Sequence, residues 1–335
     1  MEHSNNVKAG TATVTIKGTG IYSGTVSKNF EIKEALYTVY GYQVVINGNF
    51  DLKYYIDLSK EAANDTDAYI EFKVGDRVQK VKQRETSNGH YVYTCEVPVA
   101  QIGDKVTATL YYKDKSYVLT QYSVKDYLNA IVQNKDKKEE YCKATDIASA
   151  ILNYGARAQL YFGYKTDSLV NSALSDAEIK KVDSILVQDI KNAITNMESG
   201  NLENNDFKYY GASLVCKSDT GMKLYFENKN SLSLKEIEKK YDISVKDCKK
   251  QVSKSINGNM ICITINDLNA TELDDNFVVQ ITNKQNSSQS MSVSTSPYIY
   301  IKKSMDLGNA KLINLSKAMY WYSQKAMEYS KTENR

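Results

Sequence analysis

The fold is decided by residues 144–164, ATDIASAILNYGARAQLYFGY, because residues 312–329, LINLSKAMYWYSQKAMEY, repeat their pattern. Alanine and tyrosine recur in both stretches at spacings of four, four and three residues, which places them on one face of a helix. The matching pairs lie 168 positions apart and are Ala150 with Ala318, Tyr154 with Tyr322, Ala158 with Ala326, and Tyr161 with Tyr329. Each stretch is therefore predicted to be an amphipathic helix that packs on another element, and the chain to contain two copies of one unit.

Further matches upstream set the limits of the two units. The shared anchors are Tyr40-Gly41 with Tyr210-Gly211, Lys53 and Tyr55 with Lys223 and Tyr225, and Gly89 with Gly258. These anchors place the first unit at residues 37–165 and the second at residues 207–331. Residues that both copies share are interpreted as packing residues, and residues that differ as specific to one copy.

Each unit is predicted to begin with antiparallel strands. Ile70, Phe72 and Val74 alternate with charged residues, so one face of that strand is buried and the other faces water. Asn88-Gly89 is the strongest hairpin signal and is expected to join its two flanking strands. The predicted strands are residues 69–74, 78–83, 91–97, 105–112 and 117–122. With the start of the unit this makes about six strands, enough for a small sandwich.

Helices are predicted to follow the strands in both units. Ser123 with Asp126 forms a capping signal for a helix over residues 124–132. In the second copy Pro297 stands at the first turn of a predicted helix over residues 298–305, where proline is tolerated. The second unit is also predicted to have an extra helical stretch over residues 232–241.

A linking helix is predicted between the units, within residues 174–200. Ser175 and Glu178 form a capping box at its start, and Gly200 is expected to end it after Met197. An apolar stripe along residues 179–197 predicts that this helix docks on the long helix of the first unit. The predicted fold class is therefore α+β, with two repeated antiparallel β-sandwich units that are each followed by helices.

The N-terminal residues 5–35 have a different pattern. Residues 9–33, AGTATVTIKGTGIYSGTVSKNFEIK, contain two alternating runs around a glycine-rich connection, which predicts a β-hairpin. A lone hairpin is marginal in water, so this hairpin is expected to be the C-terminal part of a truncated module, with any export signal upstream of it. The parent would then be longer than this chain.

These residues carry a resemblance to a known class of proteins. The run GTATVTIKGTG followed by FEI resembles the last strands of the bacterial Ig-like repeats that build stalks in large surface proteins of gut clostridial bacteria. The helix ASAILNYGARAQLYF resembles that of paired modules found downstream of such repeats. The resemblance implies an extracellular or cell-surface protein, attached through regions outside this chain. It also implies a relation to superantigen-like surface proteins that bind immunoglobulin.

Composition and charge exclude several other classes. The 335 residues are 42% hydrophobic and 25% charged, which is ordinary for a globular chain. The net charge of +3 is small, and lysines alternate with acids, so the chain is not predicted to bind nucleic acid. It contains no stretch of eighteen apolar residues, so no membrane insertion is expected. The chain is expected to be a monomer.

No catalytic or cofactor motif is recognised. His90 beside the Asn88-Gly89 turn is interpreted as exposed polar surface, because it has no nucleophile or metal ligand at a recognisable spacing. Phosphate-binding glycine loops are absent from the sequence, so neither a cofactor nor enzyme activity is predicted. The acidic clusters at residues 65–67, 204–206 and 274–275 are explained by turn preference, and a structural calcium stays an open alternative.

The five cysteines are predicted to be free thiols. Cys95, Cys142, Cys216, Cys248 and Cys262 form no C-x-x-C pair. If a disulfide existed, Cys216 and Cys262 would be the first pair to test, because both lie in predicted strands of one sandwich. Burial in an apolar setting is the expected state of such thiols.

Binding is the function that remains. Tyrosine is over-represented, with 27 residues against 7 phenylalanines, which suits contact surfaces and half-buried strands. Trp321 replaces Asn153 of the first copy and lies about 100° from Tyr322 around the helix, so it is either partly exposed or packed on its own sheet. The predicted contact residues are Trp321, Tyr320, Tyr111 and Tyr117.

Two classes of binding protein stay open. One is an adhesin that recognises a folded host protein through aromatic anchors, and the other is a carbohydrate-binding or structural spacer module with a flat aromatic platform. The resemblance favours the first class, with immunoglobulin variable domains as the leading partner. The function is thus predicted to be non-catalytic recognition outside the cell.

Overall fold

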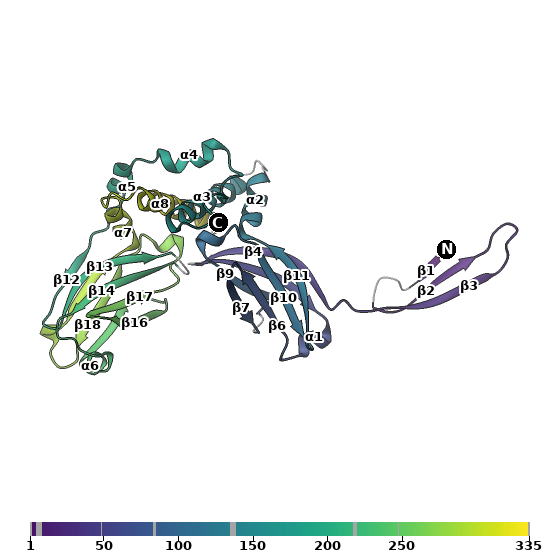
Figure 1. The fold of residues 1–335 in the computed structure, drawn as a ribbon, viewed down its shortest axis with the longest axis horizontal. Coiled ribbons are helices and arrows are strands. Elements are labelled where there is room, and N and C mark those ends of the chain that lie inside the picture. Colours follow the sequence, from purple (N-terminus) through teal and green to yellow (C-terminus); the bar gives the residue numbers. More distant parts are fainter. Residues whose placement is uncertain are drawn as a thin grey trace.

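The computed structural model of the chain describes residues 2–4, 9–47, 49–82, 85–134, 139–216, 220–246 and 248–333. Two β-sandwiches lie side by side below a layer of helices that joins them, and an N-terminal hairpin projects away from the first sandwich (Figure 1). The predicted α+β class with repeated sandwich units is confirmed.

The first unit consists of two four-stranded sheets that pack face to face. Their strand orders are β4-β5-β9-β8 and β11-β10-β6-β7. Tyr54 and Phe72 come from opposite sheets, are fully buried, and bring their ring centroids to 4.9 Å. The strands are β4 (Tyr37–Asn47), β5 (Asn49–Leu58), β6 (Tyr69–Val74), β7 (Arg77–Val81), β8 (Glu85–Ser87), β9 (His90–Val97), β10 (Val106–Tyr112) and β11 (Lys115–Tyr122).

The Asn88-Gly89 hairpin is confirmed, but one of its predicted strands is wrong. Both turn residues have positive φ, 52° and 85°, and they join β8 to β9. The predicted strand 78–83 instead becomes β7, which pairs with β6 in the other sheet. The tight turn at Gly75-Asp76 returns the chain at once, so β7 pairs with the strand before it.

The second unit repeats this architecture with different edges. Its first sheet, β13-β14-β17-β16, has the order of β4-β5-β9-β8. In its second sheet, β19-β18-β15 corresponds to β11-β10-β6, while β12 joins the free edge of β19. In the described part of this unit no strand takes the place of β7. The strands are β12 (Ser199–Asn201), β13 (Phe207–Val215), β14 (Gly221–Asn228), β15 (Tyr241–Lys246), β16 (Val252–Asn257), β17 (Met260–Ile265), β18 (Phe277–Asn283) and β19 (Met291–Thr295).

The helices after the strands are confirmed in both units. Ser123 and Asp126 form the expected capping box of the first helix. In the second unit Ser296 is the N-cap, and Pro297 follows it in the first turn of the helix. The bounds are α2 (Val124–Gln133), α3 (Glu139–Phe162), α7 (Pro297–Ser304) and α8 (Ala310–Glu333). The short helix predicted over residues 232–241 is confirmed as α6 (Leu234–Lys240), but the prediction that it is extra to the second unit is wrong, because the first unit has a counterpart in α1 (Lys60–Asn64).

The predicted single linking helix is wrong, because the chain bends between two shorter helices, α4 (Asp176–Ser184) and α5 (Val187–Ala193). Ile185 and Leu186 have extended backbones at the bend, and the bend lets both Val182 and Ile190 become buried. Gly200 does not end a helix. It lies in β12 with φ of 119°, where a Cβ atom would approach the Ser292 carbonyl oxygen to 2.2 Å.

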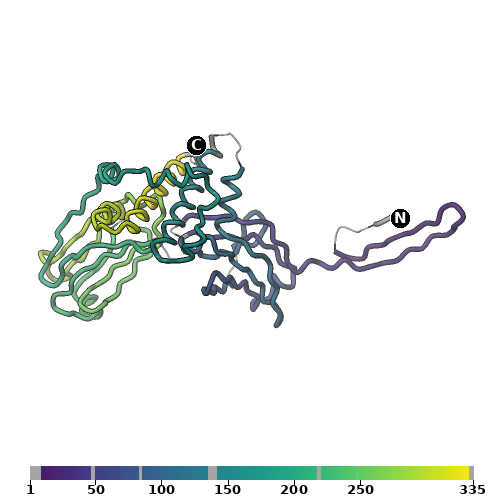
Figure 2. The backbone as a smooth tube through the Cα atoms, turned by 45° about the horizontal axis from the view of Figure 1, so that its top comes forward, coloured from purple at the N-terminus to yellow at the C-terminus, as the bar shows by residue number. Residues whose placement is uncertain are grey.

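The two long helices α3 and α8 pack on each other and form the centre of the molecule (Figure 2). Tyr154 and Tyr322, which occupy equivalent positions in the two copies, stack at 5.6 Å with an interplanar angle of 18°. Phe50 contacts both rings, at 6.5 Å and 5.8 Å. Contact between equivalent residues is the mark of an approximate two-fold relation between the copies.

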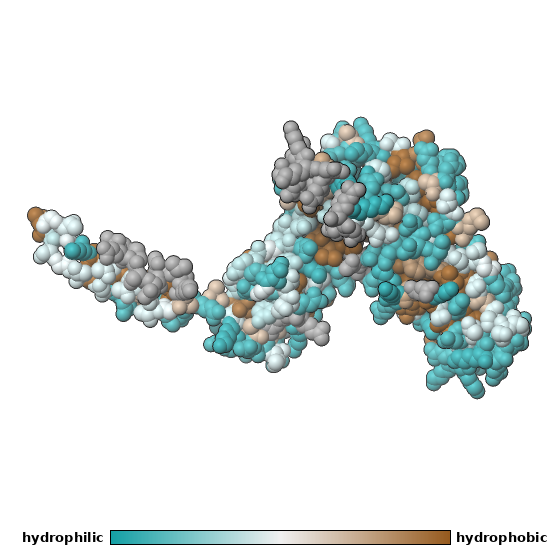
Figure 3. Space-filling view, turned by 180° about the vertical axis from the view of Figure 1, so that it is seen from behind, coloured by the Kyte–Doolittle hydropathy of each residue, from teal (hydrophilic) through white to brown (hydrophobic). Residues whose placement is uncertain are grey.

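The N-terminal part is a three-stranded sheet with little core. The strands are β1 (Glu2–Ser4), β2 (Gly10–Lys17) and β3 (Thr25–Ile32), so β1 adds to the predicted hairpin. Val26 and Phe30 are 71% and 44% exposed, and apolar residues also reach the surface at the far tip (Figure 3). Among the described residues, part of the apolar face of this sheet is therefore left uncovered.

Candidate functional site

The four contact residues predicted from the sequence do not form one surface. Trp321 and Tyr320 lie on α8, whereas Tyr111 and Tyr117 lie on the sheet of β10 and β11. Tyr111 stacks on Tyr69 at 4.8 Å on the outer face of that sheet. Tyr117 is paired with Leu110, whose side chain is fully buried, so it points to the inner face. The four residues therefore lie on different parts of the molecule, and their role as contact residues stays a prediction.

Trp321 is both partly exposed and packed on the rest of the protein, which were the two alternatives left open by the sequence. Its side chain is half-buried and packs against the apolar core, while the Lys325 ammonium lies 4.6 Å from its ring centre. The neighbouring Tyr320 contacts the Tyr298 ring at 5.4 Å. Trp321 and Tyr320 therefore both contribute to the packing of the helical layer.

His90 is half-buried rather than freely exposed as predicted. Its Nδ1 lies 3.1 Å from an Asp57 carboxylate oxygen, and its ring lies 4.2 Å from that of Tyr40. Within the described ranges no serine, threonine or cysteine side chain hydrogen-bonds to the ring. The described residues also contain no group of three or more His, Cys, Asp and Glu side chains placed to hold a metal.

The five thiols are all unpaired. Cys95 and Cys262 are buried, Cys216 and Cys248 are half-buried, and Cys142 is exposed. Burial raises the pKa of the Cys95 thiol to about 12 and that of Cys216 to about 11. These two thiols therefore stay protonated at neutral pH and are poor nucleophiles.

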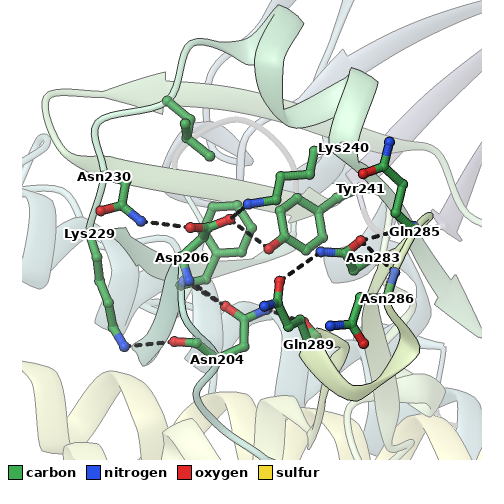
Figure 4. A network of polar contacts seen from close by, with 12 residues as sticks. Asn204, Asp206, Lys229, Asn230, Lys240, Tyr241, Asn283, Gln285, Asn286 and Gln289 are labelled. Atoms are coloured by element: carbon green, nitrogen blue, oxygen red, sulfur yellow. Dashed lines mark hydrogen bonds and ion pairs between the residues drawn. The ribbon is translucent and has the colours of Figure 1, made fainter.

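A buried polar network lies at the far end of the second unit (Figure 4). Its centre is Asp206, which is 4% exposed. The Asp206 carboxylate accepts hydrogen bonds from Asn230 Nδ2 at 2.6 Å, Lys240 Nζ at 2.5 Å and Tyr241 Oη at 2.7 Å. The Asp206 amide donates to Asn204 Oδ1 at 2.9 Å, which closes the turn before β13.

The electrostatics of this network indicate a structural role. Burial opposes ionisation of Asp206, but the Lys240 ammonium and the two neutral donors hold its pKa below the usual range. Burial and the nearby carboxylate raise the pKa of Tyr241 to about 12. Because donors already surround the carboxylate, Asp206 has little capacity left for a ligand, and the network joins α6 and β15 to the start of β13.

A pocket of about 240 Å³ lies where the helical layer meets the outer face of β13 and β14. Aromatic rings from both units line it: Tyr161 and Phe162 at the end of α3, Tyr225 on β14 and Tyr300 on α7. Tyr161 and Phe162 are 36% and 38% exposed, and their rings meet edge to face at 5.0 Å. The pocket is therefore a product of the pairing of the two units, which the sequence could not show.

The polar groups of the pocket are only partly satisfied. Tyr225 Oη and Ser213 Oγ share a hydrogen bond of 3.0 Å. Lys223 lies beside them, half-buried, and no carboxylate among the described residues pairs with its ammonium. Burial, followed by the proximity of Tyr161, Cys216 and Tyr225, raises the pKa of Tyr300. Its hydroxyl stays protonated at neutral pH and can donate a hydrogen bond.

An open groove continues from the pocket across the same sheet face. Tyr225 belongs to both, and the groove is lined further by Tyr210, Glu227, Asn259 and Met260. Tyr210 is 78% exposed because it lies at the irregularity between Tyr209 and Gly211, where β13 has an extra residue. The bulge thus presents a large aromatic ring to solvent next to an acid and an amide.

The first unit carries the same surface residues. Tyr40 lies at an equivalent irregularity in β4 and is 58% exposed, and the Tyr55 hydroxyl donates to Gln43 Oε1 at 2.7 Å as Tyr225 pairs with Ser213. Lys53 precedes Tyr55 as Lys223 precedes Tyr225. The interpretation of these shared residues as packing residues is wrong, because they lie on the outer face. Their alternation with buried apolar residues is the signal that could have found this surface.

No helix in the described ranges is long and apolar enough to span a membrane. Comparison with protein-family models, with curated proteins and with solved structures finds no match to this chain. The resemblance to bacterial surface proteins therefore stays a prediction from the sequence, and the groove and pocket of the second unit are the candidate site that the structure itself provides.

Proposed function

We propose that this chain is a non-catalytic recognition module of a bacterial cell-surface protein, and that it binds a host protein through the groove of the second unit. Tyr210 is the main support for this proposal, because its large aromatic side chain is 78% exposed beside a groove of about 540 Å³. Exposed aromatic rings surrounded by polar groups are typical anchors of protein interfaces. Glu227 and Asn259 provide such polar groups at its rim.

Immunoglobulin variable domains are the first partner to test. The resemblance of the N-terminal strands and the long helix to superantigen-like surface proteins supports this choice. The paired scaffold supports it as well, because rigid units held by α3 and α8 present a preformed surface with little entropic cost on binding.

A carbohydrate ligand is the second candidate, and one observation favours it. In the groove, Tyr210 and Tyr225 are flanked by the Glu227 carboxylate and the Asn259 amide. Flat rings beside acids and amides suit sugar rings, whose faces are apolar and whose edges carry hydroxyl groups.

The two candidates are separated by passing human serum and a glycan array over the immobilised chain in parallel. Retention of immunoglobulin with a dissociation constant at or below about 1 μM supports the protein partner, because interfaces of standard size reach this range. Glycan binding with no retained serum protein contradicts it and supports the carbohydrate ligand.

Substitution of the anchor tests the surface. Tyr210→Ser should weaken binding by more than about 2 kcal/mol, the loss expected for a central aromatic anchor. Tyr40→Ser, at the equivalent bulge of the first unit, is the matched control and should bind as the unchanged chain does. Equal affinity of both variants would show that the groove is not the contact surface.

A further inference from the structure

The two copies differ in residues at the position of the pocket. Ile46 in the first unit corresponds to the smaller Cys216 in the second, and Ala148 corresponds to Ser316. The tyrosines differ in their contacts as well. Tyr127 forms a hydrogen bond with the backbone of Val44, whereas its counterpart Tyr300 has no such bond to a described residue and lines the pocket. Cys216 therefore takes up less of this space than isoleucine would, whereas Ser316 adds a hydroxyl group to the pocket lining.

The pocket also carries a positive charge from Lys223. Lys223 lines the pocket, and no described carboxylate forms an ion pair with its ammonium group. A half-buried ammonium without an ion-pair partner favours an anionic ligand, because the ligand's charge would offset part of its lost hydration. Tyr300 lines the same pocket, and its hydroxyl could donate a hydrogen bond to the same anion.

The apolar wall restricts the rest of the ligand. Leu312, Leu315 and Met319 of α8 line the pocket together with the aromatic rings. A sugar ring has hydroxyl groups on all of its edges, and each hydroxyl left unpaired against this aliphatic wall would cost about 1–3 kcal/mol. A flat aromatic ring has no such groups and stacks on tyrosine and phenylalanine.

We infer that the pocket between α3, α8 and the β13–β14 face binds a small aromatic carboxylate, with its ring between Phe162 and Leu315 and its carboxylate at Lys223. This site adjoins the groove proposed above as the protein-binding surface and shares Tyr225 with it, but the inference does not depend on that proposal.

The test uses the full chain and four small probes. Phenylacetate and indole-3-acetate carry the aromatic ring and the carboxylate, phenylacetamide lacks the charge, and glucuronate carries the charge on a sugar ring. Titration calorimetry should show binding of the two aromatic acids, with phenylacetamide at least about tenfold weaker, a loss of about 1.4 kcal/mol. No binding of either aromatic acid, or binding of glucuronate with equal or greater affinity, overturns the inference.

The repeat supplies matched control variants. Lys223→Met should abolish the preference for phenylacetate over phenylacetamide, whereas Lys53→Met, at the equivalent position of the first unit, should leave it unchanged. Cys216→Ile introduces the residue of the first unit and should fill the pocket and abolish binding. Circular dichroism verifies that each variant is folded. A preference for the carboxylate that survives in Lys223→Met would contradict the assignment.

Discussion

Asp104 and Asp206 are the buried carboxylates of the described chain, and each is held by a lysine and a tyrosine that are neighbours in sequence. Tyr164 Oη and Lys165 Nζ contact Asp104 at 2.5 Å and 2.6 Å, as Tyr241 and Lys240 contact Asp206. Buried charges are retained only when hydrogen-bonding groups surround them. The first cluster connects the turn before β10 to the segment after α3, and the second connects the start of β13 to α6 and β15.

Removing the charge at Asp206 should destabilise the second unit. Asp206→Asn leaves the Lys240 ammonium without its counter-ion, so the free energy of unfolding should fall by about 1–3 kcal/mol in urea denaturation at pH 7. The stabilisation of the unchanged chain should be complete above the unfolded-state pKa of about 3.9 and should be lost as pH falls through the lower folded-state pKa.

Asp206→Asn should lack this component of the pH dependence. Asp306→Asn is the control, because Asp306 is 63% exposed in its ion pair with Lys191 and its replacement should leave stability nearly unchanged. Equal unfolding curves for the two variants would show that the network contributes nothing.

At the scale of elements, local signals act through hydrogen bonds within a few residues. The Ser175–Glu178 capping box is formed as predicted, since the Ser175 hydroxyl accepts from the Glu178 amide and the Glu178 carboxylate accepts from the Ser175 amide. The prediction of one continuous linking helix that ends after Met197 was wrong. Burial of Ile190 and Ile194 against the helical layer stabilises the bent chain more than one unbroken helix would.

The N-terminal sheet is an element that should be dispensable. It projects away from the first sandwich and exposes its apolar residues, so deleting residues 1–33 should leave the thermal midpoint of the remainder nearly unchanged. Differential scanning calorimetry measures this. The deletion must spare Leu36, whose carbonyl accepts from the Ser59 amide and whose side chain packs on the core.

A longer deletion, which also removes β4, should have the opposite effect to the deletion of residues 1–33. It removes the edge strand of the first sheet and should prevent this unit from folding. A large fall in the midpoint for the shorter deletion would show instead that the hairpin belongs to the first unit.

At the scale of the whole molecule, the helical layer makes one body of two sandwiches. The equivalent tyrosines Tyr154 and Tyr322 stack at its centre, and burial raises the pKa of both hydroxyls well above the usual range. The pocket exists because the end of α3 reaches the sheet of the other unit. The contact that joins the two units therefore also forms the pocket.

Removing the stacked rings of Tyr154 and Tyr322 should make the two units unfold independently of each other. Tyr154→Ala and Tyr322→Ala should each cost about 3–5 kcal/mol, and a double-mutant cycle should give a coupling of about 0.5–1.5 kcal/mol for the ring pair. The double variant should unfold in two calorimetric transitions. Tyr111→Ala, which removes a stacked ring on an outer sheet face, should leave the cooperativity unchanged. Strictly additive losses with one transition would contradict a coupling role.

The sequence by itself determined the repeat, the α+β class, the capped helices and the tight turns. Helical spacing, capping boxes and Asn-Gly chemistry act over a few residues, and duplication makes each pattern visible twice. It did not determine that β7 crosses to the other sheet, that β12 joins the edge of β19, or that the linking helix bends.

Only the tertiary structure decided the candidate site. Tyr161, Lys223 and Tyr300 come from three elements and two units, and their proximity depends on the crossing of α3 and α8. The spacing of Lys223 and Tyr225 along one strand fixes which face they share, but not what covers that face. Packing between distant elements is set by the shapes and volumes of whole surfaces, so short-range patterns cannot specify it.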